Sequence, residues 1–182
     1  MLKLKDKRIY LGDVAAQLAR HFRNDPEIRK WCREYTEISE AKHERWLTKI
    51  EEDPSIKMFG IYINQLDIKD ESMGKIAACI GTCGLTSIDR VNQNAEFSLY
   101  IAKNYQKMGY GKEALQTLIW HGFNDFNLHR IWGEVFEGNP ALKIFKEIGF
   151  TIEGVLRKSY FREGKFIDSI RIGILRGEEC LS

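Results

Sequence analysis

The sequence is poor in the features that mark specialised classes of protein. It has only three prolines in 182 residues, no low-complexity segment, no internal repeat and no linker rich in proline and glycine. Its four cysteines, Cys32, Cys79, Cys83 and Cys180, form no C-x-x-C pair and match no common zinc-ligand spacing. We therefore expect a single domain over residues 1–182, with no metal and with buried, reduced thiols.

Long apolar runs and a dominant charge are also missing. No stretch approaches the roughly 20 apolar residues of a membrane-spanning helix, and the N-terminal MLKLKDKRIYLGD lacks the apolar core of a secretory signal. The 28 lysines and arginines are interspersed with 26 aspartates and glutamates, so no basic stripe indicates nucleic-acid binding. These absences predict a cytoplasmic protein with neither a membrane nor a nucleic acid as partner.

What the chain does contain is an alternation of strand-like and helix-like segments. Helices are expected at about 14–22, after Asp25-Pro26, over 39–53, along an apolar stripe from Leu115 to Phe126, and within 139–150. Strands are expected at 7–13, 56–63, 73–89, 94–102 and 130–138, followed by a hairpin that turns at Glu163-Gly164. This order predicts an α/β (α+β) fold, with a mixed sheet and helices on its faces.

The start of the helix near residue 110 has an unusual composition. The segment Gln106-Lys-Met-Gly109-Tyr-Gly111-Lys112 contains no Ser, Thr, Asp or Asn to cap the helix. Lysines at the positive end of a helix dipole cost about 0.3–1 kcal/mol each, whereas a bound anion reverses that sign. The two glycines let the backbone approach such an anion closely. The segment therefore predicts an anion site, with an ordinary surface turn as the plainer alternative.

Two phosphate-binding patterns fit this segment poorly. Gly109-x-Gly111-x-x-Ala114 matches the dinucleotide fingerprint formally, but that fingerprint expects a strand leading directly into its first glycine. A Walker A loop needs Ser or Thr after the lysine, and Lys112 is followed by Glu113. Both matches are therefore weak.

The segment instead resembles the pyrophosphate loop of the acyl-CoA N-acyltransferase (GNAT) superfamily, whose pattern is Gln/Arg-x-x-Gly-x-Gly/Ala. Gln106, Gly109 and Gly111 occupy its three fixed positions, and the late Gly149-Phe150 is also typical of that superfamily. The stretches AEFSLYI and EGVLRKSYFREGKFIDSI are most similar to its RimJ/RimL branch. The resemblance covers essentially the whole chain. It implies a GNAT-type mixed, central twisted sheet of about seven strands with helices on both faces.

The same resemblance implies an enzyme that uses acetyl-CoA as co-substrate and acetylates a primary amine by direct attack on the thioester. Phe145 stands where the superfamily often has the tyrosine that protonates the leaving thiolate, which leaves Tyr160 or a water for that role. The cofactor contacts that the resemblance implies are Leu99, Tyr100, Ile101, Gln106, Lys107, Met108, Gly109, Tyr110, Gly111, Lys112, Asn139 and Phe145.

A proton acceptor is needed because an amine with a pKa near 10 is mostly protonated at neutral pH. Glu96 is the candidate, since alternation in NAEFSLYIA puts it on the polar face of its strand, and it also suits binding of a cationic substrate. The resemblance implies substrate contacts from the first two helices and the last hairpin, and Asn24, Trp31 and His43 are candidates there. For Trp31 and His43 a packing role is the plainer interpretation.

The sequence leaves the amine open. The RimJ/RimL branch acetylates protein N-termini, polyamines and other amines, whereas FRNDPEIRKW and ISEAKHERW resemble, over a shorter stretch, enzymes that acetylate amino-sugar nucleotides. The absence of a tyrosine at Phe145 also fits a catalytically silent acyl-CoA-binding protein. A nicotinamide-binding protein is a more distant alternative. Both a monomer and a homodimer agree with the sequence.

Overall fold

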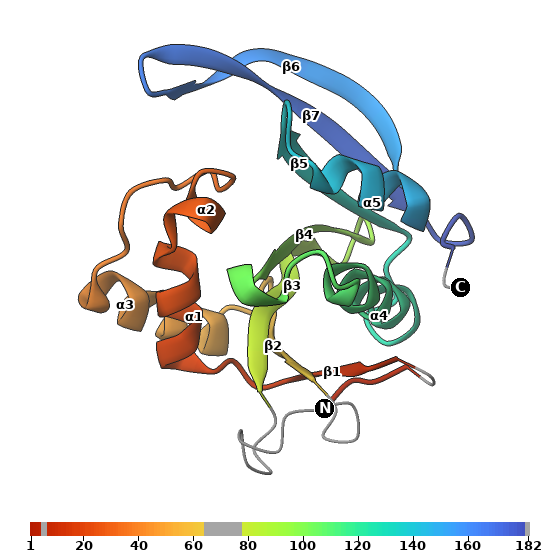
Figure 1. Cartoon of the computed structure of the whole chain (residues 1–182). Helices are drawn as coiled ribbons and strands as arrows, with labels where there is room; N and C mark the ends of the chain where they lie inside the picture. Colours follow the sequence, from red (N-terminus) through yellow and green to blue (C-terminus); the bar gives the residue numbers. More distant parts are fainter. Residues whose placement is uncertain (5–6, 64–77, 181–182) are drawn as a thin grey trace.

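The computed structural model describes residues 1–4, 7–63 and 78–180, and its centre is a seven-stranded sheet (Figure 1). The strand order is β1-β2-β3-β4-β5-β7-β6. The expected mixed sheet is confirmed, although the first residues of the strand expected at 73–89 lie outside the described residues. The strands are β1 Ile9–Gly12, β2 Lys57–Ile63, β3 Cys79–Asp89, β4 Asn94–Ile101, β5 Arg130–Phe136, β6 Thr151–Arg162 and β7 Lys165–Leu175.

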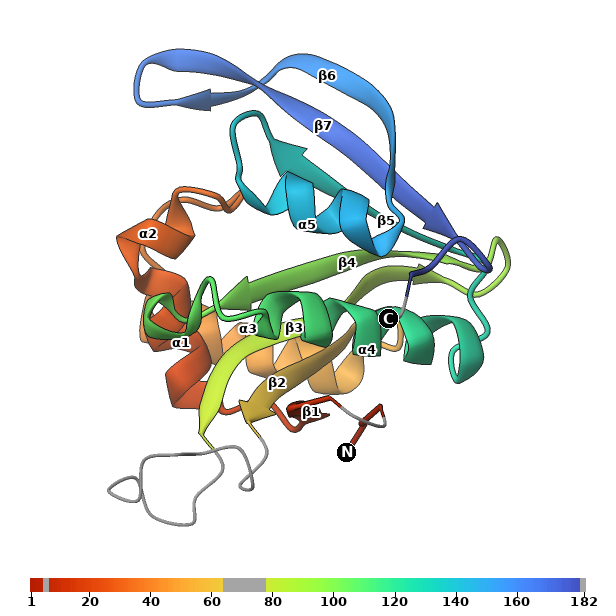
Figure 2. The ribbon, with the colours of Figure 1, turned by 45° about the vertical axis from the view of Figure 1, so that its right-hand side comes forward.

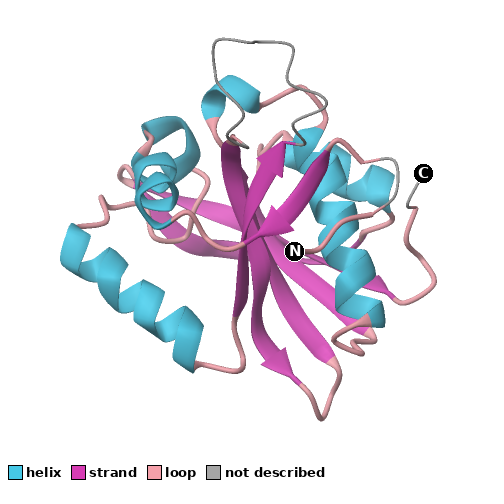
Figure 3. Ribbon diagram, turned by 90° about the horizontal axis from the view of Figure 1, so that it is seen from below, coloured by secondary structure: helices cyan, strands magenta, loops and turns pink. Residues whose placement is uncertain are grey.

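Helices cover both faces of the sheet (Figure 3). Asp25 caps the second helix by accepting from the Glu27 N–H at 2.8 Å, and Ser39 caps the third by accepting from the Lys42 N–H at 3.3 Å. These two caps are where the sequence predicts helix starts. The helices are α1 Ala16–Asn24, α2 Pro26–Arg29, α3 Glu40–Glu52, α4 Tyr110–Asn124 and α5 Ala141–Ile148, with a 3₁₀ turn at Lys103–Tyr105.

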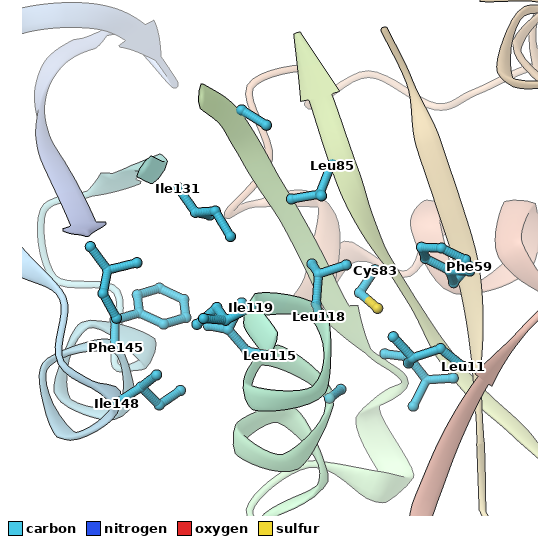
Figure 4. Packing of buried hydrophobic residues seen from close by; sticks show 14 of the residues in the cluster. Leu11, Phe59, Cys83, Leu85, Leu115, Leu118, Ile119, Ile131, Phe145 and Ile148 are labelled. Atoms are coloured by element: carbon cyan, nitrogen blue, oxygen red, sulfur yellow. The ribbon is translucent and has the colours of Figure 1, made fainter. Parts of the chain in front are cut away.

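The main core lies between α4, α5 and the sheet (Figure 4). Leu115, Leu118, Ile119 and Phe123 of α4 are all at most 2% exposed, and they form the apolar stripe that the sequence predicts. Burying side chains of this size contributes roughly 1.5–3 kcal/mol each. The helix ends at Asn124, so Phe126 packs against the core from the following turn and not from the helix.

The pairing between β4 and β5 determines where a ligand can enter the sheet. These two strands are parallel, and their register covers only Asn94–Glu96 of β4 against Arg130–Trp132 of β5. Beyond Glu96 the strands diverge, although β4 continues to Ile101 and β5 to Phe136 (Figure 2). The second half of β4 therefore has β3 on one side and no paired strand on the other, within the described part of the chain.

The cysteines differ partly from the expectation. All four are unpaired; Cys83 is buried, Cys32 and Cys79 are half-buried, and Cys180 is exposed. The expectation of buried thiols is therefore wrong for Cys180, which lies beyond the last strand. Its backbone is anchored, because its N–H donates to the Ile148 carbonyl at 2.8 Å and its carbonyl accepts from Gln116, but these bonds do not cover its thiol. No helix among the described residues is long and apolar enough to cross a membrane.

Candidate active site

Helix α4 begins without a side-chain cap, as its sequence indicates. Gly109 occupies the N-cap position with a φ of 89°, in the left-handed region that side-chain-bearing residues rarely adopt, and it provides no side-chain cap hydrogen bond. At Gly111 a Cβ atom meets nothing closer than Ile101 Cγ1 at 3.5 Å, so internal packing does not require glycine there. The helix thus presents N–H groups at the positive end of its dipole, which is an arrangement that binds phosphate.

The residues around this helix start form what we call the phosphate loop, residues 106–112. The Gln106 side chain does not point away from the protein but donates to the Ile101 carbonyl at 2.8 Å, so it ties the loop to the end of β4. Lys107 also has a left-handed φ, of 61°. Met108 is half exposed, and Lys107 and Lys112 add positive charge to the loop.

Arg8 supports the phosphate loop from the strand β1 side, and sequence reasoning missed it. Its backbone N–H and its Nε donate to the Glu113 carboxylate at 2.9 and 2.6 Å, and its Nη2 donates to the Met108 carbonyl at 2.8 Å. The guanidinium also lies 4.6 Å from the centre of the Tyr110 ring. Arg8 therefore neutralises Glu113, the only acid in the first turn of α4.

The three predicted cofactor contacts on β4 differ in what their side chains can offer. Ile101 is buried in the core, and Leu99 packs partly against it. The Tyr100 hydroxyl donates to the Ala19 carbonyl at 3.0 Å, and burial raises the pKa of Tyr100 to about 12. What this part of β4 offers to a ligand is therefore mainly its backbone, on the side that β5 leaves unpaired.

Glu96 lies where the β4–β5 pairing ends. Glu96 is only 6% exposed, and its carboxylate forms an ion pair with Arg33 on the loop after α2. Burial raises the pKa of Glu96, and the Arg33 guanidinium opposes that rise without cancelling it. A carboxylate of this kind gains basicity toward the neutral range, where a general base works best.

A second buried carboxylate, Glu134 of β5, was not predicted. Its side chain is 7% exposed, accepts from Ser169 Oγ at 2.6 Å and lies 3.8 Å from Arg171 Nη2. Arg171 in turn stacks 4.1 Å over the Trp132 ring. The sequence indicates this site only weakly, because Glu134 is a single glutamate inside the otherwise apolar strand RIWGEVF. The strand that pairs with β5 could not be read from the sequence.

Tyr160 of β6 lies close enough to both carboxylates for their charges to act on it. Its ring centre lies 4.8 Å from that of Phe136, and burial followed by the nearby Glu134 charge raises the pKa of Tyr160. Arg33 and Glu96 also act on its hydroxyl electrostatically. The structure thus brings the two predicted catalytic residues, Glu96 and Tyr160, to one cluster around Glu134. A tyrosine with a raised pKa stays protonated at neutral pH and can donate a proton.

The segment after β5 positions Asn139 and Phe145 differently. Asn139 Oδ1 accepts from the N–H of Ala141, the first residue of α5, at 3.0 Å, which leaves the Asn139 side-chain NH₂ as the group able to contact a ligand. Phe145 is 7% exposed and meets Phe97 edge-on, with ring centres 5.2 Å apart. Phe145 thus fills the space between α5 and the diverging strands and supplies no proton.

The three predicted substrate residues have contacts with residues outside this cluster. The Asn24 side chain exchanges two hydrogen bonds with the backbone of Ile38, at 3.0 and 2.8 Å. Trp31 follows α2 and lies 5.6 Å from Lys30 Nζ. His43 is buried, with Nε2 2.7 Å from the Ala16 carbonyl, and it borders a cavity of about 400 Å³ between α1 and α3. None of the contacts described for these side chains reaches Glu96, Glu134 or Tyr160.

Comparisons with known proteins identify the family of the chain. The family model described as an acetyltransferase (GNAT) domain matches residues 8–151. The chain is 29% identical over 181 residues to the uncharacterized N-acetyltransferase p20 of Bacillus licheniformis, covering 97% of this chain and 94% of that protein. It is 32% identical over 100 residues to the spermidine N(1)-acetyltransferase of Vibrio cholerae, covering 54% of this chain and 58% of that protein.

Solved structures match over a longer span. The crystal structure of spermidine N-acetyltransferase from Vibrio cholerae in complex with CoA and spermine superposes with a TM-score of 0.81 at 24% identity, covering 94% of this chain and 97% of that one. This likeness confirms the GNAT-type fold, and the family match confirms the predicted acetyl-CoA-dependent N-acetyltransferase. The chain belongs to the GNAT acetyltransferase family.

Proposed function

We propose that this chain acetylates a small primary amine, with the CoA pyrophosphate on the phosphate loop and the amine beside Glu96. The observation that carries the proposal is a combination of two features along β4: a helix start without a side-chain cap, and a buried carboxylate where β4 leaves β5. The first feature suits phosphate and the second suits proton removal. Acetyl transfer from CoA to an ammonium ion requires both.

In this proposal acetyl-CoA lies along β4. The pyrophosphate accepts hydrogen bonds from the first N–H groups of α4, and Lys107 and Lys112 add positive charge. The pantetheine arm then runs beside Leu99–Ile101, where its amide groups pair with backbone groups that no strand occupies on that side. The free NH₂ of Asn139 approaches the arm from the other side of the opening.

The chemistry follows from the positions of the carboxylates. Glu96 takes one proton from the ammonium group, directly or through a water, and the freed amine lone pair attacks the thioester carbonyl carbon. The tetrahedral intermediate collapses by breaking the C–S bond, and the departing thiolate takes a proton from Tyr160 or water. The attacking nitrogen loses its second proton, which restores the proton that Tyr160 or water gave to the thiolate. Glu96 passes the first proton to solvent, so each turnover releases one proton. The products are the N-acetylated amine and free CoA thiol.

The names of relatives support a small amine as the acceptor. Two spermidine N(1)-acetyltransferases, from Vibrio cholerae and Escherichia coli, match just over half of this chain. The RimJ/RimL resemblance also implies protein N-termini as possible acetyl acceptors. Phe145, which lacks a hydroxyl, favours a second candidate: a protein that binds acyl-CoA without catalysis.

Thermal unfolding with acetyl-CoA, NADH and ATP in parallel tests the cofactor assignment. A ligand present at about one hundred times its dissociation constant adds roughly 2.7 kcal/mol to the folded state, so the shift is measurable. We expect a shift with acetyl-CoA and none with NADH. Thiol release from acetyl-CoA in the presence of an amine panel then separates the two candidates: stabilisation without thiol release on any amine identifies the silent binder.

A further inference from the structure

Two arginines that the proposed mechanism does not use meet at the loop between α2 and α3. Arg23, at the end of α1, donates from Nη2 to the Glu34 carbonyl. Arg162, at the tip of β6, donates from Nη2 to the Cys32 carbonyl at 3.4 Å and to the Arg33 carbonyl. Two guanidinium groups from distant elements thus bind three consecutive carbonyls of one loop.

Each of the two guanidinium groups has a buried nitrogen without a hydrogen-bond partner. Within residues 1–4, 7–63 and 78–180, only three buried side-chain nitrogen or oxygen atoms lack a partner; two of them are Arg23 Nη1 and Arg162 Nε, and the third is His121 Nε2. Buried donors in native proteins are almost always satisfied, so unpaired donors on two cations that bind the same loop indicate a site for an acceptor.

The charges around these arginines point the same way. In the described part of the chain neither Arg23 nor Arg162 forms an ion pair, whereas the nearby acids already have partners: Glu96 pairs with Arg33, and Glu34 with Lys42. Both arginines are half-buried, and a cation that is partly removed from water is stabilised by a counterion. The acceptor is therefore most simply an anion.

The position of Arg162 links this pair to the reacting groups. Its guanidinium lies 4.5 Å from the ring centre of Tyr35 and 5.4 Å from those of Phe136 and Tyr160. Three rings hold it in place, and one of them belongs to the cluster around Glu134. The carbonyl it binds belongs to Arg33, whose side chain reaches Glu96. An anion at Arg162 thus lies next to the amine position.

We propose that the preferred acceptor is an amine that carries its own anionic group, a carboxylate or a phosphate, which binds Arg23 and Arg162 while the amine meets Glu96. This inference rests on the proposed function, because it assigns the substrate class of the same site. Guanidinium groups suit carboxylate and phosphate because they can donate two parallel hydrogen bonds. Polyamines, which have no anionic group, are then poor acceptors.

Matched amine pairs test the inference with the unmodified protein. Thiol release is compared for glucosamine 6-phosphate against glucosamine and for phenylalanine against phenylalaninamide, with spermidine as the polyamine. We expect kcat/KM to be at least about tenfold higher for the anionic member of one pair, and the pair that responds tells phosphate from carboxylate. Equal rates within both pairs, or a preference for spermidine, overturn the inference and leave the acetyltransferase assignment intact.

Variants test which residues bind the anionic group of the amine. Arg23→Gln and Arg162→Gln should each raise KM for the better anionic amine about tenfold and leave KM for acetyl-CoA within about twofold. Arg162→Lys keeps the charge and should lose less. Arg157→Gln, an exposed arginine on the same strand, is the matched control and should change neither constant. A rise in KM for acetyl-CoA in place of the amine shows that the arginines bind a cofactor phosphate, which overturns the inference.

Two further measurements keep the outcomes distinct. Melting temperatures of the variants show whether either substitution prevents folding, in which case the matched amine pairs decide the question alone. If no amine releases thiol, the proposed function fails, and anion binding is then tested separately by thermal unfolding with CoA and glucosamine 6-phosphate against glucosamine. A larger shift with the phosphate supports the anion site, and equal shifts overturn it.

Discussion

Arg8 and Glu113 are 105 positions apart in the sequence, yet Arg8 Nε donates to the Glu113 carboxylate at 2.6 Å across the start of α4. The contact removes a negative charge from the end of the helix where phosphate is proposed to bind. It also fixes the phosphate loop, because the same arginine donates to the Met108 carbonyl.

Replacing Arg8 by glutamine should therefore weaken cofactor binding. We expect KM for acetyl-CoA to rise about five- to tenfold with kcat nearly unchanged, because Glu113 then repels the pyrophosphate. The Arg8 side chain is 42% exposed, so the loss of stability should be at most about 1 kcal/mol. Steady-state kinetics and a denaturant titration measure the two effects. Arg90→Gln is an exposed control, and an unchanged KM in Arg8→Gln would refute the role of Arg8.

Replacing Gly109 by aspartate should block the phosphate site. The left-handed φ strains any side-chain-bearing residue, a Cβ atom there comes 3.0 Å from Arg8 Nη2, and the new charge repels phosphate. We expect KM for acetyl-CoA to rise at least tenfold. Gly177→Asp is the matched control, because Gly177 also has a positive φ, of 99°, with nothing within 4 Å of its Cβ position. Similar cofactor affinity in both variants would remove the basis for the phosphate loop.

Glu96→Gln should lower turnover without changing cofactor affinity. The amide cannot accept the ammonium proton, and general-base catalysis typically contributes about 10²–10⁴-fold. We expect kcat to fall by about that factor while KM for acetyl-CoA stays within twofold. Glu147→Gln, an exposed acid on α5, is the control. Turnover equal to that of the parent at every pH would show that Glu96 is not the base.

The pH profile should report the raised pKa of Glu96. The base must be ionised, so activity is lost as the pH falls through the pKa of Glu96, which burial holds above its ordinary value. Arg33 opposes that rise, and Arg33→Gln should therefore move the acid limb of kcat/KM to higher pH. Arg29→Gln serves as a control on the preceding helix. An acid limb that moves to lower pH in Arg33→Gln contradicts the assignment of this limb to Glu96.

Tyr160→Phe tests the proton donor. A thiol with a pKa near 8.5 leaves without much assistance, so we expect kcat to fall only about tenfold, at the low end of acid–base effects. Phe161→Leu, on the same strand with an exposed ring, is the control. Single-turnover kinetics separate the chemical step from product release. If the chemical step keeps its full rate in Tyr160→Phe, water protonates the thiolate.

Much of the fold could be predicted because its signals are local. Ser39 and Asp25 cap helices where expected, and the apolar spacing of α4 indicates its buried stripe, because hydrogen-bonding and periodicity rules act within a few residues. The uncapped helix start at Gly109 could also be predicted, because the lack of a capping residue and the two glycines are visible in the sequence. The burial of Glu96 was not, since its position on a polar strand face does not say what covers that face.

The sequence by itself determined the order of strands and helices, the phosphate loop and the family resemblance, all of which depend on neighbouring residues. Only the tertiary structure decided the composition of the site. The pairing of Arg8 with Glu113, the electrostatic influence of Glu134 on Glu96, and the approach of Arg162 to a loop 130 residues earlier all depend on the strand order β1-β2-β3-β4-β5-β7-β6 and on the divergence of β4 from β5. No periodicity encodes such contacts, because they arise when separate elements pack on one sheet.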